Sequence, residues 1–334
     1  MSKRLYLAYT GGTLGMRPSA QGYVPAPGFL SELMGQLAPL LPTDWQLTLA
    51  EYPRLIDSSN ATPADWLYLA QDIAANYEQH DGFVILHGTD TMAYSAAALS
   101  FWLQGLDKPV IITGSQIPAC EARSDANNNV LAALHWAAQD DLCEVAIAFA
   151  DRLIRGNRST KVKATALDAF DSPSYPWLGQ VGIHLQLQPQ WLLPKPSQAP
   201  IWHLPKQVES NVQCLRLFPG ISADLVEAVL ALPYQGLVLQ SFGVGNAPDQ
   251  DARLLEVLEQ ATKAGKTILN VSQCLQAEVD PAYATGSRLA QAGVIAGGSM
   301  TIEAAMTKLH VLLAQGLQGD ALRTQLERNL AGER

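Results

Sequence analysis

Short apolar runs that end in small polar residues recur along this chain, and they constrain its fold more than any other feature. They lie at 4–13 (RLYLAYTGGT), 82–91 (GFVILHGTDT), 109–118 (PVIITGSQIP), 144–157 (EVAIAFADRLIRGN), 236–246 (GLVLQSFGVGN) and 267–274 (TILNVSQC). Each run is continuously apolar rather than alternating, which is typical of strands that are covered on both faces of a mainly parallel sheet.

Segments with helical character follow or flank these strands. Residues 92–103 are rich in Ala and Leu, and residues 128–138 follow Ser124 and Asp125, which are candidate helix caps. Amphipathic helices are predicted around the two later strands, and closing helices at the end of the chain, over 219–230, 247–265, 300–315 and 320–330. Strands that alternate with helices indicate an α/β fold.

A proline-rich stretch interrupts this rhythm between about 186 and 211. The length of 334 residues is large for a single core, so the chain is predicted to form two domains. We predict an N-terminal α/β catalytic domain over 1–187, a linker over 188–210 and a smaller C-terminal α/β domain over 211–334.

Composition excludes several classes of partner. The net charge is -9 and there is no long basic run, which argues against a nucleic-acid or anionic-membrane partner. The cysteines at 120, 143, 214 and 274 form no CxxC pair, so no metal or redox motif is predicted. No run approaches the ~18 apolar residues of a membrane span, and no signal segment is recognisable at the start, so we expect a cytoplasmic protein.

Hydroxyl and carboxylate side chains follow the predicted strands. In open α/β sheets, ligands bind beyond the carboxyl ends of the strands, where Thr10, Thr13, Thr89, Asp90 and Ser115 are expected. Any one of them alone is more often a turn or cap residue. Their occurrence at several strand ends together predicts a site there.

The glycines at 11, 12 and 15 do not form a phosphate loop. Their spacing fits neither G-x-G-x-x-G nor the P-loop. The GKT at 265–267 has Gln260 in the position of the first P-loop glycine and precedes a strand instead of following one. The serine-hydrolase elbow G-x-S-x-G is absent as well.

A threonine nucleophile is the remaining chemistry, and it needs a base to take its proton. His87 is close to Thr89 in the sequence and could be this base, but a structural role is at least as common for a histidine inside a strand. A lysine held by a carboxylate can serve as this base. Lys161, in RGNRSTKVKA after the fourth strand, is the leading candidate because it too follows a predicted strand end. Considered by residue type alone, Lys161 is a solvated charge.

Together these segments resemble the bacterial L-asparaginase family, in particular its type I, cytoplasmic branch. The resemblance covers almost the whole chain, through YTGGT (9–13), LHGTDTM (86–92), KPVIITGSQ (108–116), RGNRSTK (155–161), GVGNAP (243–248) and YATG (283–286). It implies a larger, flavodoxin-like N-terminal domain with a mainly parallel sheet and a smaller α/β C-terminal domain. It also implies a homo-oligomer, either dimer or tetramer, that hydrolyses L-asparagine to L-aspartate and ammonia through an acyl-enzyme, with no metal or other cofactor.

The resemblance carries catalytic roles to particular residues. Thr13 matches the nucleophile of the family, and the glycines before it are interpreted as room for a substrate near the backbone. Thr89 and Asp90 match the HGTDT pair, and Lys161 matches the lysine that supports Thr89. Tyr23 matches the lid tyrosine close to the nucleophile.

Substrate binding is implied for four residues. Asp57 and Ser58 match the residues that hold the α-amino and α-carboxylate groups, and Thr89 and Asp90 also face the substrate in the family. Asp90 is suited to the substrate ammonium through a charge-assisted hydrogen bond. Glu278 resembles a glutamate that the secreted branch takes from a neighbouring subunit, although a solvated loop carboxylate is the more common case.

An allosteric asparagine site is associated with the type I branch, and this sequence departs from it. The family has an arginine in the strand before GVGNAP, where this chain has Gln240. Thr160, Asn246 and Cys274 still match residues near that site. Because glutamine cannot grip a carboxylate as the arginine fork does, we predict weakened or absent cooperativity.

Two other functions stay open at this point. One is an amidase for glutamine or for a peptidyl or tRNA-linked amide, and the other is an amino-acid-binding module without turnover. The set Thr13, Thr89, Asp90 and Lys161 argues against the module, because binding alone does not need a lysine beside a second hydroxyl.

Overall fold

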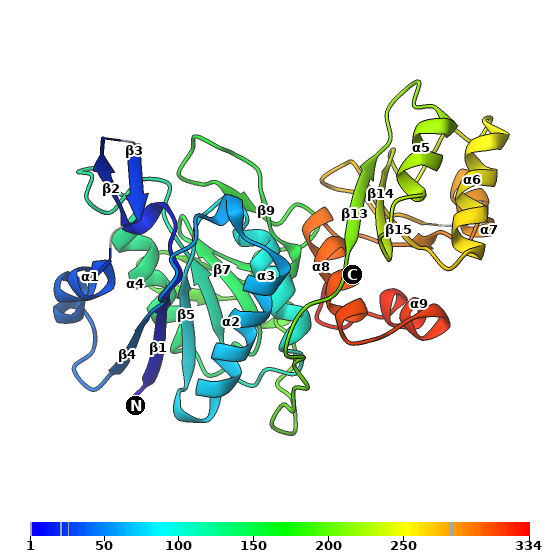
Figure 1. The fold of residues 1–334 in the computed structure, drawn as a ribbon. Coiled ribbons are helices and arrows are strands. Elements are labelled where there is room, and N and C mark those ends of the chain that lie inside the picture. The colour runs from blue at the N-terminus through cyan, green and yellow to red at the C-terminus, as the bar shows by residue number, and fades with distance from the viewer. Residues whose placement is uncertain (1, 21, 26, 281–283) are drawn as a thin grey trace. The chain divides into compact units, whose positions relative to one another are not determined.

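The computed structural model describes residues 2–20, 22–25, 27–280 and 284–334. It divides the chain into two compact units, Met1–Leu204 and Pro205–Arg334, each with its own sheet (Figure 1). Among the described residues, no helix has both the length and the apolar character that a membrane crossing requires.

The first unit is built on an eight-stranded sheet in the order β12-β11-β8-β7-β6-β5-β1-β4. These strands are β1 (Arg4–Tyr9), β4 (Gln46–Glu51), β5 (Gly82–Leu86), β6 (Val110–Thr113), β7 (Val145–Phe149), β8 (Arg152–Arg155), β11 (Gly179–Val181) and β12 (Leu185–Leu187). The strands from β4 to β7 are parallel, and β8, β11 and β12 extend the sheet in antiparallel fashion. The parallel part has the flavodoxin order 2-1-3-4-5, whose switch point lies between its first and third strands, here β1 and β5.

Helices cover both faces of this sheet. Figure 1 shows α2 (Pro63–Asn76) and α3 (Met92–Trp102) on one face, and α1 (Phe29–Leu37) and α4 (Ala126–Ala137) on the other. The side chains of β5 that point to either face are all fully buried, which explains its continuous apolar sequence. The helix α3, predicted over 92–103, is apolar all round because it lies between the sheet and other elements.

Short elements complete the first unit. The strands β2 (Met16–Ser19) and β3 (Gly22–Pro25) form a hairpin after β1, and β9 (Thr160–Lys161) pairs with β10 (Phe170–Asp171). Single 3-10 turns occur between the larger elements, namely η1 (Thr13–Gly15), η2 (Ala38–Leu40), η3 (Ser58–Asn60), η4 (Tyr77–Gln79), η5 (Gly156–Arg158) and η6 (Pro189–Trp191).

One local prediction is wrong and a second holds only in part. The apolar run at 144–157 is not one strand, because the chain turns at Ala150 (φ 47°) and Asp151 (φ 64°) and returns as the antiparallel strand β8. Two residues with positive φ are the requirement of a tight type I′ hairpin turn. Of the two predicted caps of α4, Ser124 uses Oγ to accept the backbone N–H of Ala126 at 3.1 Å. Asp125 stands at the N-cap position, but its carboxylate makes no cap bond and instead accepts the backbone N–H groups of Gln116 and Ile117.

The proline-rich segment begins against the first unit. The backbone N–H of Leu193 donates to the buried carboxylate of Glu144, and the carbonyl of Trp191 accepts from Arg155. Further along, the Trp202 indole donates to the carbonyl of Gln104 at 2.8 Å. These contacts fasten part of the segment that we expected to act as a linker.

The second unit is a smaller α/β sandwich. Its sheet has the order β13-β14-β15-β16 and is parallel throughout, with strands Val212–Arg216, Gly236–Ser241, Thr267–Ser272 and Ile295–Ala296. The helices are α5 (Ala223–Leu230), α6 (Ala252–Lys263), α7 (Ala284–Gln291), α8 (Ile302–Ala314) and α9 (Gly319–Glu327). Within this unit, α5 and α6 lie on the face of the sheet opposite α8 (Figure 1). The predicted pairing of a large, mainly parallel domain with a small α/β domain is therefore confirmed.

Candidate functional site

Three backbone segments meet at the switch point between β1 and β5. Gly12 has φ 89°, and a Cβ there would stand 2.3 Å from Cα of Gly88. A Cβ on Gly11 would stand 2.4 Å from the carbonyl oxygen of Ile56, and one on Gly88 would stand 2.5 Å from Oγ of Ser58. Neighbouring backbone therefore excludes a side chain at Gly11 and Gly12, and the interpretation of these glycines as room for a substrate stays a prediction.

The two threonines of the first motif have different surroundings. The Thr10 side chain is buried, and its hydroxyl donates to the carbonyl of Leu86 at 2.9 Å, so it joins β1 to β5. Thr13 begins η1 and is partly exposed, and its hydroxyl makes no hydrogen bond to any described residue. Of the two hydroxyls, only that of Thr13 is available to a ligand.

Lys161 brings the second threonine and its neighbouring carboxylate together. Its Nζ donates to Oγ1 of Thr89 at 2.8 Å and to Oδ1 of Asp90 at 2.7 Å. Thr89 is buried, whereas the Asp90 side chain is 63% exposed. Lys161 lies in β9, after β8 and the turn η5. Because β8 is antiparallel, Lys161 does not follow the carboxyl end of one of the parallel strands, contrary to the prediction.

Ser58 fixes the turn that carries these groups. Its Oγ accepts the backbone N–H of Asp90 at 3.2 Å, and its carbonyl accepts the hydroxyl of Thr91 at 2.7 Å. The hydroxyl proton of buried Ser58 is left to donate elsewhere. Asp57 is exposed and uses Oδ1 to accept the N–H of Ser59 at 3.2 Å. The structure thus gathers Asp57, Ser58, Thr89, Asp90 and Lys161 around one edge of the sheet.

His87 has a structural environment. It is buried, with Nδ1 2.7 Å from the carbonyl of Gly88 and Nε2 2.9 Å from Oγ of Ser95. Because a carbonyl can only accept, Nδ1 carries the proton and Nε2 accepts from the serine hydroxyl. Burial also lowers the pKa of His87, which favours the neutral ring. Both ring nitrogens are occupied, so the ring is not free to act as a base.

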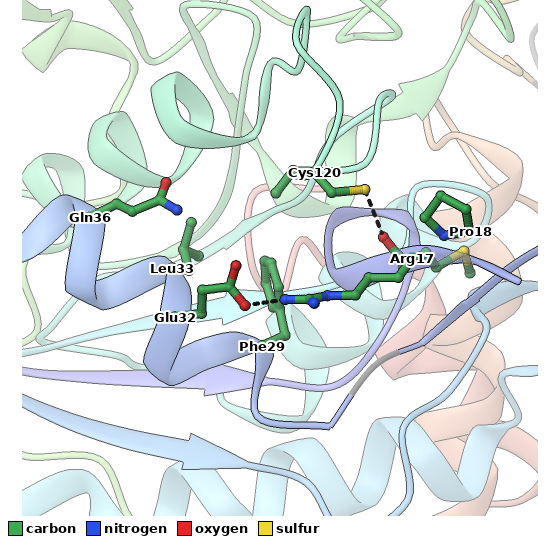
Figure 2. Close-up of a pocket in the computed structure, with 9 residues that line it drawn as sticks. Arg17, Pro18, Phe29, Glu32, Leu33, Gln36 and Cys120 are labelled. Atoms are coloured by element: carbon green, nitrogen blue, oxygen red, sulfur yellow. Dashed lines mark hydrogen bonds and ion pairs between the residues drawn. The ribbon is translucent and has the colours of Figure 1, made fainter.

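Tyr23 extends from the hairpin that follows Thr13. Its side chain is about half exposed, and its hydroxyl donates to Oε1 of Glu121 at 2.5 Å instead of contacting Thr13. Behind this hairpin lies a pocket of about 460 Å³ between β2, α1 and the loop after β6 (Figure 2). Arg17 and Glu32, which form an ion pair, and Cys120 are among the residues that line this pocket. Glu121 was not among the residues predicted from the sequence. The one sequence signal that could have indicated it is its position in the loop after the predicted strand at 109–118.

The residues assigned to an allosteric site belong to different units. Thr160 is buried in β9 of the first unit, whereas Gln240, Asn246 and Cys274 lie in the second. The carbonyl of Gln240 accepts the N–H of Leu217 and the side-chain amide of Gln273, both at 2.9 Å, but its own side chain makes no hydrogen bond among the described residues. Glu278 is exposed, and Tyr283 of the YATG motif lies outside the described residues.

In the described part of the chain, no three His, Cys, Asp or Glu side chains are grouped so that they could hold a metal ion. The acidic residues of the site, Asp57 and Asp90, are engaged with an amide and an ammonium respectively. The described side chains of the site include the free hydroxyl of Thr13, the lysine-bound hydroxyl of Thr89 and the exposed carboxylate of Asp90. A hydroxyl beside a possible base is the arrangement that nucleophilic catalysis requires.

Comparison with known proteins identifies the family. The model of the asparaginase N-terminal domain matches residues 4–192, and the model of the glutaminase/asparaginase C-terminal domain matches residues 211–326. The chain belongs to the asparaginase family. The resemblance found in the sequence is thereby confirmed.

Individual relatives are similar to this chain over nearly its whole length. The chain is 46% identical over 336 residues to L-asparaginase 1 of Escherichia coli K12, covering 99% of this chain and 98% of the relative. It is 41% identical to a human 60 kDa lysophospholipase, covering 99% of this chain and 61% of that protein. The crystal structure of L-asparaginase I from Vibrio cholerae has a TM-score of 0.91 and 42% identity, with 100% of this chain and 99% of the other covered.

Proposed function

We propose that this protein hydrolyses the side-chain amide of L-asparagine to L-aspartate and ammonia through an acyl-threonine. The observation that supports this most is the contact of Lys161 with both Thr89 and Asp90, at the same sheet edge as the free hydroxyl of Thr13. The full-length similarity to L-asparaginase 1 of E. coli supports the choice of substrate.

In the first step, we assign Thr13 as the nucleophile. Its Oγ bonds to the amide carbon, the C–N bond breaks, and the hydroxyl proton leaves with the nitrogen as ammonia. In the second step, the oxygen of water bonds to the ester carbon, the bond between that carbon and Oγ of Thr13 breaks, one proton of the water passes to Oγ, and aspartate is released. Lys161 and Thr89 are the assigned proton carriers, because Nζ of Lys161 lies 2.8 Å from Oγ1 of Thr89.

Substrate binding is assigned to the neighbouring polar groups. Asp90 uses Oδ1 for Lys161, and because its side chain is largely exposed, Oδ2 is assigned to the substrate ammonium. The unused hydroxyl proton of Ser58 suits the substrate α-carboxylate, and Asp57 adds a second negative charge for the ammonium. Tyr23 is assigned the role of covering the nucleophile. A dimer or tetramer and a cytoplasmic location stay predictions.

Ammonia release from asparagine and from glutamine by the purified chain tests the proposal. We expect asparagine to be the better substrate by kcat/KM. Preference for glutamine would replace the proposal by the alternative amidase, and binding of asparagine without ammonia release would replace it by a binding module.

A further inference from the structure

Lys161 is carried by a very small sheet. The strands β9 and β10 have two residues each and lie outside the eight-stranded sheet. Such a short two-stranded ribbon has little stability of its own, so other contacts must hold it. On the β10 side, Phe170 packs on Phe149 with ring centroids 5.0 Å apart, and Arg152 donates to the carbonyl of Phe170 at 3.4 Å and to Asp168 at 3.5 Å.

The β9 side of the connecting loop, residues 162–169, is held by Gln116. Its Nε2 donates to the carbonyl of Ala164 at 3.1 Å and to the carbonyl of Ala166 at 3.0 Å. Because carbonyls can only accept, the nitrogen of the side-chain amide must face the loop, and both of its N–H groups are used. The alanine side chains cannot form hydrogen bonds, so Gln116 holds this part of the loop through its backbone.

Gln116 is itself fixed by α4. The carboxylate of Asp125 accepts the backbone N–H of Gln116 at 3.0 Å and that of Ile117 at 3.0 Å. Asn129 donates to the same carboxylate at 3.0 Å and to the carbonyl of Gly114 at 2.9 Å. The loop after β6 is therefore a fixed support, and the amide of Gln116 connects it to the loop after β9.

We infer that Gln116 is a positioning residue for Lys161: by holding the loop after β9, it keeps the ammonium group on both of its partners in the site. This rests on the proposed function, in which Lys161 and Thr89 carry protons. The flexible stem of a lysine allows many positions of Nζ, so two simultaneous hydrogen bonds, at 2.8 and 2.7 Å, require a backbone that does not move. Gln116 acts through the loop and is assigned no contact with the substrate.

Steady-state kinetics with a matched control test the inference. Gln116→Met keeps the length of the side chain but removes both donors, and it is expected to lower kcat for asparagine about tenfold, because a proton carrier is misplaced. Gln116→Glu is expected to lose at least as much, because a carboxylate would face two carbonyl oxygens.

Gln139→Met is the control. Nε2 of Gln139 also donates to a backbone carbonyl, that of His135 at 3.0 Å, but it lies after α4, where the chain returns to the opposite edge of the sheet before β7. This control is expected to keep the wild-type kcat.

Urea unfolding separates positioning from general damage. Both methionine variants lose hydrogen bonds from a part-buried amide to the backbone, so we expect shifts of similar size in their unfolding midpoints. A merely structural contribution of Gln116 would shift the midpoint and leave the kcat of the folded protein unchanged. That result would overturn the inference.

The reactivity of the Lys161 amine gives a readout without turnover. Reductive methylation with formaldehyde and borohydride, followed by mass spectrometry of peptides, measures how readily each lysine is modified. In Gln116→Met, Lys161 is expected to react at least about threefold faster than in the wild type, because the loosened loop lets it leave its partners. Lys108, whose Nζ donates to the carbonyl of Tyr77 at 2.8 Å, is the internal reference and is expected to stay unchanged.

Three results would each overturn the inference: wild-type kcat in Gln116→Met, an equal loss of kcat in Gln139→Met, or an unchanged reaction rate of Lys161. Absence of asparagine hydrolysis by the wild-type chain would instead overturn the proposed function. The two failures are distinguishable, because the methylation of Lys161 does not depend on turnover.

Discussion

A fully buried ion pair holds the end of the chain on α8, and its removal is predicted to destabilise the second unit strongly. Lys308 and Glu333 are both completely buried, with Nζ 2.6 Å from Oε1. Nζ also donates to the carbonyls of Leu326 at 2.9 Å and Arg328 at 2.6 Å, so its three N–H groups are all used. The ammonium group of Lys308 thus holds the end of α9 and the residues that follow it, through the carbonyls of Leu326 and Arg328 and the carboxylate of Glu333.

The size of the effect follows from what each substitution leaves behind. Glu333→Ala leaves a buried ammonium with two carbonyl partners and no opposite charge. Loss of one partner from a buried pair costs about 3–5 kcal/mol, against a total stability of about 5–15 kcal/mol for a typical domain. As a control, Glu327→Ala breaks the exposed pair with Arg323 on α9, for which about 0.5 kcal/mol is expected.

Urea denaturation followed by circular dichroism measures both losses. At pH 7, Glu333→Ala is expected to lose about 3 kcal/mol or more of the free energy of unfolding. A loss below about 1 kcal/mol, or one equal to that of the control, would refute the reasoning, because it would mean that the buried ammonium finds other partners.

The same pair predicts a pH dependence. Burial alone would raise the pKa of Glu333, but Lys308 and the N–H groups of Leu330 and Ala331 outweigh it and hold the pKa below the ordinary value of 4.5. The ionised carboxylate therefore contributes stability above pH 4.5, which is lost as the pH falls through the folded-state pKa. Glu333→Gln is expected to remove this part of the acid dependence.

Two further predictions concern the site and its regulation. Gly12→Ala is expected to lower asparagine turnover more than about tenfold, because a Cβ would meet Cα of Gly88 at 2.3 Å and displace the turn that carries Thr89. Gly265→Ala is the control, with a similar φ of 95° but nothing within 4 Å, and unchanged turnover is expected there; equal turnover in both variants would contradict the packing argument. Gln240 predicts a hyperbolic dependence of rate on asparagine concentration, and a steep sigmoid curve would contradict the predicted loss of cooperativity.

The strands of the core could be predicted from the sequence because burial on both faces leaves a continuous apolar run. The edge strands β4 and β13 were not predicted. Many of their side chains are exposed, so their sequences lack the continuous apolar run that marks the central strands. The reversal at Ala150 and Asp151 was missed for a different reason: neither residue is glycine or asparagine, and the apolar run continues after them.

The site could be predicted to the level of motifs but not of contacts. The strand-end rule selected Thr13, Thr89 and Asp90, which the switch point between β1 and β5 brings to one edge. The contact of Tyr23 with Glu121 depends on a turn in the loop after β6, and no local sequence pattern encodes such a pairing over 98 residues. Likewise, the filling of the space beside Gly11 by Ile56 depends on tertiary packing.

The central claim is that Thr89, held by Lys161, carries protons in the hydrolysis of asparagine. Replacement by valine keeps the shape of the buried side chain and removes the hydroxyl that accepts from Nζ. We expect Thr89→Val to fold as the wild type does and to release ammonia from asparagine at least about a hundredfold more slowly, the range of a positioned acid–base group. Thr10→Val, which removes a buried hydroxyl bonded only to backbone at the neighbouring strand end, is expected to stay active. Wild-type ammonia release by Thr89→Val would contradict the account.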